Sequence, residues 1–168
     1  MFKNIFAAFA SIAIAAGPAA AFVDAGTTDL IRTVDESDIV VSVGNPKYCD
    51  SGEYLGAYIH SGMRRWMALC PGAEVDGLDH AVVRHEVWHA VQHCVNVARG
   101  TSLTTPVNQD TQDLMADVFE HVPESIIKGV QDNYPREQWL LEFEANLIMV
   151  ILSASEVEDA FQQACLAS

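Results

Sequence analysis

The sequence predicts an α+β fold, in which a small N-terminal antiparallel β-sheet is followed by a bundle of helices. Two observations lead to this prediction. Up to about residue 70, short segments rich in β-branched residues alternate with turn residues, as is typical of strands. From residue 78 onward, apolar residues recur with the spacing of amphipathic helices. The 168 residues contain no repeat and no long linker, and this length suits a single domain.

The first 21 residues have the features of an export signal. Lys3 precedes an uncharged apolar run over residues 5–16, and small residues follow at 19–21. A run of about 12 apolar residues is too short to cross roughly 30 Å of hydrocarbon as a helix. We therefore expect cleavage after residue 21, a mature domain over residues 22–168 and a secreted or periplasmic protein that is not stably inserted in a membrane.

The charge balance limits the class of partner. The formal net charge is −14 at pH 7. A field of this sign repels polyanions and anionic membrane surfaces, so nucleic acid is excluded as a partner. The acidity itself favours solubility rather than a particular ligand.

The strands are expected in the first half of the chain. A short helix over residues 27–34 precedes a strand over 38–43, which the turn residues at 44–46 close. Two further strands, over 54–60 and 65–70, flank a turn and form a hairpin. We expect the segment at 65–69 to lie at the sheet edge, where it could hold an extended substrate by strand addition.

The helical half contains five expected helices and one loop. The loop is polar, contains a proline and covers residues 101–110. The helices are expected over residues 78–98, 113–120, 123–133, 135–153 and 156–166.

Four cysteines, an even number in an exported chain, predict two disulfides. Cys49 precedes the first strand of the hairpin and Cys70 ends the second, so folding of the hairpin brings these two together. Four cysteines allow three pairings, among which the sequence alone does not choose; we favour this pair, together with Cys94 and Cys165 for a reason given below.

The motif HEVWH at residues 85–89 points to a metal site. In a helix, His85 and His89 share one face and lie roughly 6 Å apart along the axis. Two imidazoles so placed can bind one Zn²⁺. Glu86 is adjacent to the first ligand and can reach a water on the metal without binding the ion itself, which makes it the candidate general base.

Catalytic zinc needs a third protein ligand and an open position. His93 lies about 12 Å along the helix axis from His85, too far to share one ion. Cys70 is another candidate, but we expect it in a disulfide. The remaining candidates are Glu142 and Glu144, in a strongly apolar helix where a carboxylate needs a partner or a metal.

Together, residues 85–89 and 142–146 resemble the gluzincin clan of zinc metallopeptidases, in which a glutamate from a later helix completes HExxH. The resemblance implies a zincin-like domain with one Zn²⁺ bound by His85, His89 and Glu142. It also implies that Asn146, where the clan often has aspartate, orients a zinc-bound histidine. A helix carrying Glu142 beside the HExxH helix would also bring the C-terminal helix close, which favours the pair Cys94 and Cys165.

Glu142 and Glu144 point about 200° apart on a helix, so at most one faces the zinc. The spacing to Asn146 favours Glu142. The alternative is that one of the two glutamates pairs with Arg136 and the other is solvated. Trp88 and Gln92 are expected to pack around the ligands and to support them, rather than to take part in catalysis.

These residues predict an exported zinc metallohydrolase, a metallopeptidase acting on a peptide or small protein, in which Glu86 takes the proton of an activated water. A nearby side chain would stabilise the oxyanion, and four residues qualify: His121, Tyr134, Tyr54 and Tyr58. Two alternatives stay open. One is a zinc amidase or deformylase-like hydrolase of a non-peptide amide. The other is a non-enzymatic binding protein with a structural or vestigial zinc site.

Overall fold

The computed structural model describes residues 26–45, 49, 55–61, 64–70, 80–101 and 104–167. The expected signal peptide at 1–21 lies outside these residues, as does Tyr54. Its strands are β1 (Ile39–Val43), β2 (Gly56–Ser61) and β3 (Arg64–Leu69). Its helices are α1 (Thr27–Asp35), α3 (His80–Ala98), α4 (Thr111–His121), α5 (Glu124–Asn133), α6 (Trp139–Ile151) and α7 (Ala154–Phe161), with a short 3₁₀ turn (Arg136–Gln138) before α6 and a π-helical turn (Gln162–Leu166) after α7.

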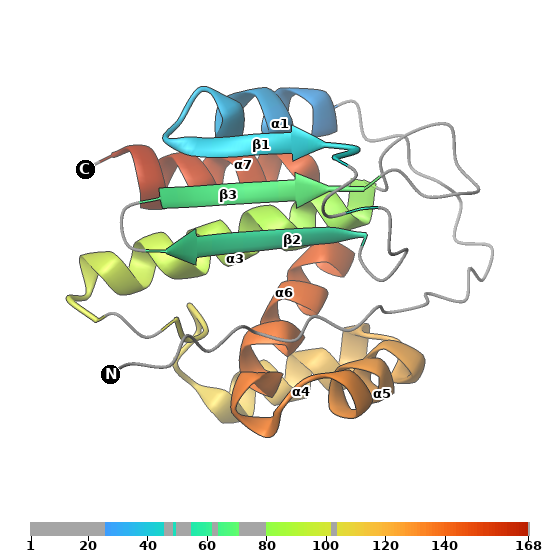
Figure 1. The fold of residues 1–168 in the computed structure, drawn as a ribbon. Helices are drawn as coiled ribbons and strands as arrows, with labels where there is room; N and C mark the ends of the chain where they lie inside the picture. The colour runs from blue at the N-terminus through green and yellow to red at the C-terminus, as the bar shows by residue number, and fades with distance from the viewer. Residues whose placement is uncertain are drawn as a thin grey trace, which may run out of the picture.

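The three strands form one sheet in the order β1-β3-β2 (Figure 1). β2 and β3 pair antiparallel, so the predicted hairpin is confirmed. The prediction of an antiparallel sheet is only partly right, because β1 joins the free side of β3 and runs parallel to it. The expectation that residues 65–69 lie at an edge is wrong, because β3 has a neighbour on both sides. Among the described strands, the edges are β1 and β2.

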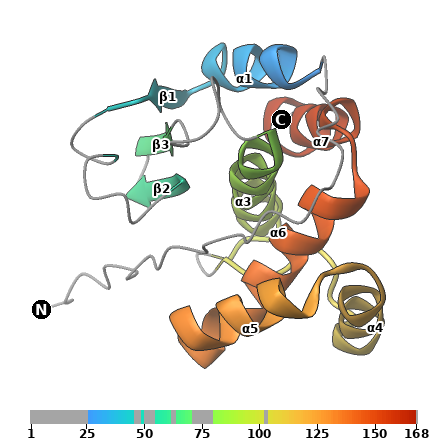
Figure 2. The same cartoon turned by 90° about the vertical axis from the view of Figure 1, so that its right-hand side faces the viewer.

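One face of the sheet packs on α3, and Figure 2 shows α3 between the sheet and the helices α6 and α7. The buried side chains of this main core come from the sheet and from α1, α3, α6 and α7; they include Leu30, Val34, Met67, Leu69, Val83, Val87, Val91 and Phe161. Because α3 is covered from both sides, its middle turns have little contact with solvent. This explains why an apolar run of helical period surrounds the HExxH motif.

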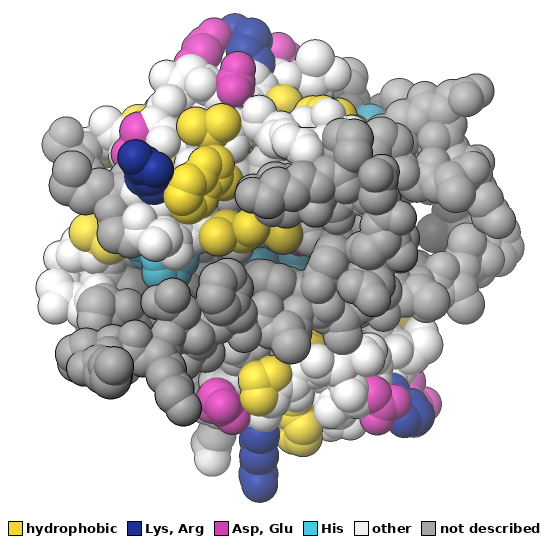
Figure 3. All heavy atoms as spheres, in the orientation of Figure 1, with side chains coloured by type: hydrophobic (Ala, Val, Ile, Leu, Met, Phe, Trp, Pro, Cys, Tyr) yellow, Lys and Arg dark blue, Asp and Glu magenta, His cyan; other side chains and the backbone are white. Residues whose placement is uncertain are grey.

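The opposite face of the sheet carries a row of hydrophobic side chains, visible over the strands in Figure 3. Val40, Trp66 and Ile59 are cross-strand neighbours in this row, and Val40 is 58% exposed. Successive side chains along each strand thus point alternately to the face that packs on α3 and to this second face, as expected for a strand.

A second core lies where α4 and α5 pack on α6; its buried residues include Leu114, Val118, Ile126, Val130 and Phe143. α6 therefore joins the two cores, since Ala145 belongs to the first and Phe143 to the second. Local signals set the ends of the helices around it. Asp110 accepts hydrogen bonds from the backbone N–H groups at the start of α4, and Ser153 forms a capping box with Glu156 at the start of α7.

Both predicted disulfides are confirmed. Cys49 is bonded to Cys70, and Cys94 to Cys165, with Cα–Cα distances of 5.4 and 5.3 Å. The first bond joins the segment before the hairpin to the end of β3, and the second joins α3 to the C-terminal turn. Two disulfides indicate an oxidising environment. Among the described helices, none combines the length and apolar character needed to span a membrane.

Candidate metal centre

Two neighbouring helices bring the predicted ligands together. His85 and His89 lie one turn apart on α3, and Glu142 lies in the first turn of α6. The two Nε2 atoms are 3.0 Å apart. Glu142 Oε2 lies 3.4 Å from His85 Nε2, and Glu142 Oε1 lies 3.6 Å from His89 Nε2. The three side chains converge on one point, as expected from the sequence.

These distances fit a shared metal ion. Ligand atoms bound tetrahedrally at 2.0–2.1 Å lie about 3.3–3.4 Å from one another, close to the three distances above. Without a cation, two imidazole nitrogens at 3.0 Å would have to share a proton to avoid lone-pair repulsion. Glu142 Oε2 is also buried without a hydrogen bond in the described part of the chain. A bound cation resolves both problems, so His85, His89 and Glu142 form a group that could hold a metal ion.

The electrostatics of the group favour an anionic carboxylate. Burial alone would raise the pKa of Glu142, but His89 and His85 outweigh it and hold that pKa well below its usual range. Burial opposes the charged form of His89, yet the charge of Glu142 prevails and raises the pKa of His89 to about 9. Glu142 is therefore ready to act as a charged ligand.

Glu86 lies beside the ligands, between α3 and the edge strand β2. It is only 6% exposed, and this burial raises its pKa, although His85 and His89 oppose the rise. The backbone N–H of Tyr58 donates to its carboxylate. Gly56 leaves the space for it, since a Cβ there would lie 2.7 Å from Glu86 Cγ and 2.9 Å from Glu86 Oε1. Strand β2 thus fixes the position of the candidate base.

Gln92 and Glu144 extend the site beyond the ligands. Gln92 Oε1 lies 2.7 Å from His89 Nδ1, and Gln92 Nε2 donates to Glu144 Oε2 at 2.9 Å. Glu144 is 3% exposed. The alternative that one of the two glutamates is solvated and the other paired with Arg136 is wrong, because both are buried and Arg136 lies over the Trp139 ring.

Asn146 has a different contact from the one that the resemblance implied. Its side-chain Nδ2 donates to the backbone oxygen of Glu142 at 2.8 Å. The contact with His89, one of the candidate ligands, is made instead by Gln92. This contact agrees with the expectation that Gln92 packs around the ligands and supports them, and its position three residues after His89 places it on the same side of the helix.

The three oxyanion candidates that the structure describes lie in different parts of the fold. His121 is exposed in the last turn of α4, and Tyr134 follows α5, where its backbone oxygen accepts from Trp139 Nε1. The Tyr58 hydroxyl lies 2.8 Å from His93 Nδ1. The assignment of an oxyanion donor to any of them stays a prediction.

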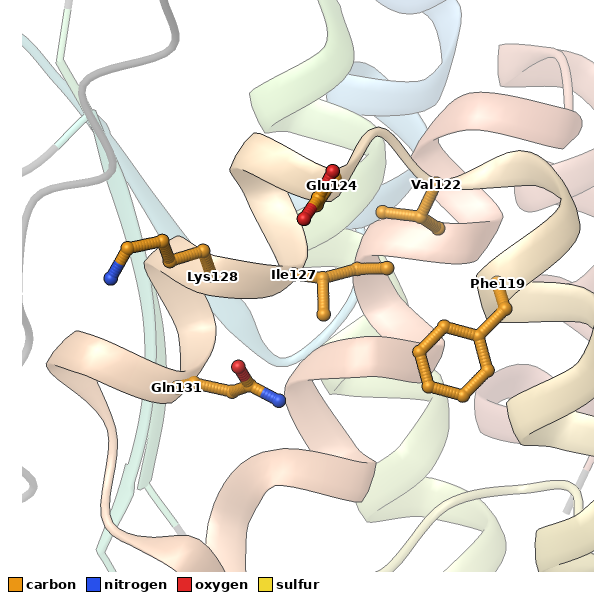
Figure 4. Close-up of a pocket in the computed structure, with 6 residues that line it drawn as sticks. All are labelled: Phe119, Val122, Glu124, Ile127, Lys128 and Gln131. Carbon is orange, nitrogen blue, oxygen red and sulfur yellow. The ribbon is translucent and has the colours of Figure 1, made fainter.

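A separate pocket of about 530 Å³ opens between α4 and α5 (Figure 4). Its walls combine apolar and charged side chains and contain none of the three ligands; they are formed by Phe119, Val122, Glu124, Ile127, Lys128 and Gln131.

Comparison with known proteins gives no match: no protein-family model, no curated protein and no solved structure resembles the chain closely enough to be matched.

Proposed function

We propose that this chain is an exported zinc-dependent metallohydrolase, a metallopeptidase of gluzincin type that cleaves peptide bonds. The observation that carries the proposal is the convergence of His85, His89 and Glu142, with the Glu86 carboxylate buried beside them. Two imidazoles and one carboxylate, with a fourth position left for water, form the ligand set of many catalytic zinc sites.

The same ligand types also bind iron(II) in oxygenases. Glu86 favours hydrolysis over oxygenation, because hydrolysis needs a base beside the metal. The two disulfides support export.

Each residue has a distinct task in this proposal. His85, His89 and Glu142 hold the ion. Bound Zn²⁺ would polarise the scissile carbonyl and acidify a water molecule. Glu86 accepts the proton of the attacking water and later returns it to the leaving amine. The Tyr58 backbone N–H and the space at Gly56 keep the Glu86 carboxylate in place while it does so.

The experiment starts with metal analysis of protein purified from an oxidising compartment. We expect about one Zn²⁺ per chain, and loss of this zinc in His85→Ala and in His89→Ala. Folded protein without zinc, even after zinc is supplied, would refute the proposal.

Hydrolysis is then followed on a mixture of unstructured peptides. Glu86→Gln should keep its zinc and lose activity by about 10²–10⁴-fold, because it removes a base and not a ligand. The matched control is Glu120→Gln, which makes the same change at an exposed position of α4. If zinc is bound but only non-peptide amides are cleaved, the protein is an amidase. Zinc binding without any hydrolysis would assign the site a structural role.

A further inference from the structure

The side-chain amide of Gln92 joins a metal ligand to a carboxylate that is not a ligand. On one side, Gln92 Oε1 lies 2.7 Å from His89 Nδ1. On the other side, Gln92 Nε2 donates to Glu144 Oε2 at 2.9 Å and to the backbone oxygen of Leu141 at 3.0 Å. Gln92 has no exposed surface, so these contacts are not exchanged for water at an open face.

These contacts determine which way the amide points. Carbonyl and carboxylate oxygens only accept hydrogen bonds, so the atom of Gln92 that faces Glu144 and Leu141 must be the NH₂ group. The oxygen of Gln92 therefore faces His89 and can only accept. It follows that His89 carries a proton on Nδ1, which it donates to Gln92. In neutral imidazole, Nε2 then has a free lone pair, and this is the atom that faces Glu142 and His85.

Glu144 is held firmly enough to fix Gln92. Four N–H groups donate to its carboxylate: Trp88 Nε1 at 3.1 Å, Gln92 Nε2 at 2.9 Å, and the backbone nitrogens of Val107 and Asn108 at 2.8 and 2.7 Å. The donors come from α3 and from the loop after it, while Glu144 itself belongs to α6. The carboxylate is therefore buried with its hydrogen-bonding capacity well used, as a buried charge requires.

We propose that Gln92, held by Glu144, is a positioning residue that keeps the proton of His89 on Nδ1 and leaves Nε2 to the metal. The inference rests on the proposed function, because it concerns the same metal centre. It assigns the two buried carboxylates of α6 to different tasks: Glu142 binds the ion, and Glu144 orients the residue that orients a ligand. Partners of this kind commonly fix the tautomer of a metal-bound histidine.

The test uses Gln92→Met in the full mature chain, since methionine fills the same buried volume but is a much weaker acceptor. The matched control is Asn96→Leu. Asn96 is another buried amide on α3; it donates to the backbone oxygens of Gln92 and Thr105 but not to His89. Two quantities are measured: the zinc dissociation constant by competition with a chelator, and the NMR signal of the His89 Nδ1–H proton in ¹⁵N-labelled protein, with and without zinc.

We expect Gln92→Met to raise the zinc dissociation constant about 10–100-fold and to lose the exchange-protected Nδ1–H signal. Asn96→Leu should keep the signal and change zinc affinity much less, even though it loosens the same loop. If Gln92→Met does not fold, Gln92→Ala serves in its place, because a smaller side chain at this position cannot cause overpacking.

Wild-type zinc affinity and a protected signal in a folded Gln92 variant would overturn the inference. The signal also separates it from the proposed function. If wild-type protein binds no zinc, the proposed function fails, and the Nδ1–H signal alone decides whether Gln92 positions His89. If zinc binds but nothing is hydrolysed, the zinc dissociation constant and the Nδ1–H signal still decide whether Gln92 positions His89.

Discussion

Glu142 and Glu144 lie two residues apart on α6, and each carboxylate contacts a different pair of side chains on α3. Glu142 faces His85 and His89, whereas Glu144 accepts from Trp88 and Gln92. Both pairs on α3 are spaced by four residues, so each carboxylate spans one helical turn. The same chemical group thus has two different sets of partners on one helix.

Glu142→Gln should weaken zinc binding strongly, because it replaces a charged ligand by a poor neutral one. We expect a larger loss than the about 10–100-fold that removal of a supporting residue causes. The measurement is chelator competition, with Glu137→Gln as the control, since Glu137 is exposed just before the same helix. Unchanged zinc affinity in Glu142→Gln would mean that the third ligand lies elsewhere.

Glu144→Gln should mainly affect stability. Its NH₂ group must face at least one of the four N–H donors that now bind the carboxylate, and a buried donor left without an acceptor costs about 1–3 kcal/mol. Urea unfolding of metal-free protein should show a loss of this size, and zinc affinity should fall less than in Glu142→Gln. An unfolding free energy equal to that of the wild type would contradict the role given to Glu144.

Much of this arrangement could be predicted from the sequence, because it depends on short-range patterns. HEVWH specifies its own geometry once it is in a helix, and the hairpin brings Cys49 and Cys70 together. What could not be predicted depends on distant parts of the chain. The hairpin offers two edges to β1, and its parallel pairing with β3 depends on which edge it joins. The partners of Glu144 include the backbone N–H groups of Val107 and Asn108, which no pattern of side chains predicts.

Gly56→Ala should impair hydrolysis without removing zinc. The added Cβ would lie 2.7 Å from Glu86 Cγ and 2.7 Å from Val82 Cγ1, so the Glu86 side chain has to move. We expect a fall in kcat with zinc content unchanged. Gly100→Ala is a useful contrast: it has open space around the new Cβ but a backbone φ of 76°, so it should cost stability and spare the site. Full activity in Gly56→Ala would show that Glu86 does not need this position.

Removal of the bond between Cys94 and Cys165 should destabilise the protein more than removal of the other disulfide. The two bonds close segments with sequence separations of 71 and 21 residues. In the chain-entropy model these contribute about 4 and about 3 kcal/mol. The comparison is urea unfolding of the double variants Cys94→Ser/Cys165→Ser and Cys49→Ser/Cys70→Ser.

Native protein, denatured without reductant, should have no alkylatable thiol. Four reactive thiols would contradict folding in an oxidising compartment.

His93 should contribute a loss of stability of the metal-free protein as the pH decreases below about 6.5. Its ring stacks on His60, and its Nδ1 lies 2.8 Å from the Tyr58 hydroxyl. Burial lowers the pKa of His93 to about 4; the charges of His60 and Arg65 act in the same direction, and the charge of Asp38 opposes them.

In the unfolded chain the pKa of His93 is about 6.5, so between pH 4 and pH 6.5 the unfolded state binds a proton that the folded state does not. Protonation of His93 then favours unfolding, and the stability that neutral His93 contributes is lost as the pH falls from about 6.5 towards 4. Relative to the wild type, the unfolding free energy of His93→Gln measured in urea should therefore rise between pH 7.5 and pH 5, with His121→Gln, a histidine outside the group of Tyr58, His60 and His93, as the control. An equal pH dependence in His93→Gln and the wild type would mean that His93 takes up its proton as readily in the fold as in the unfolded chain.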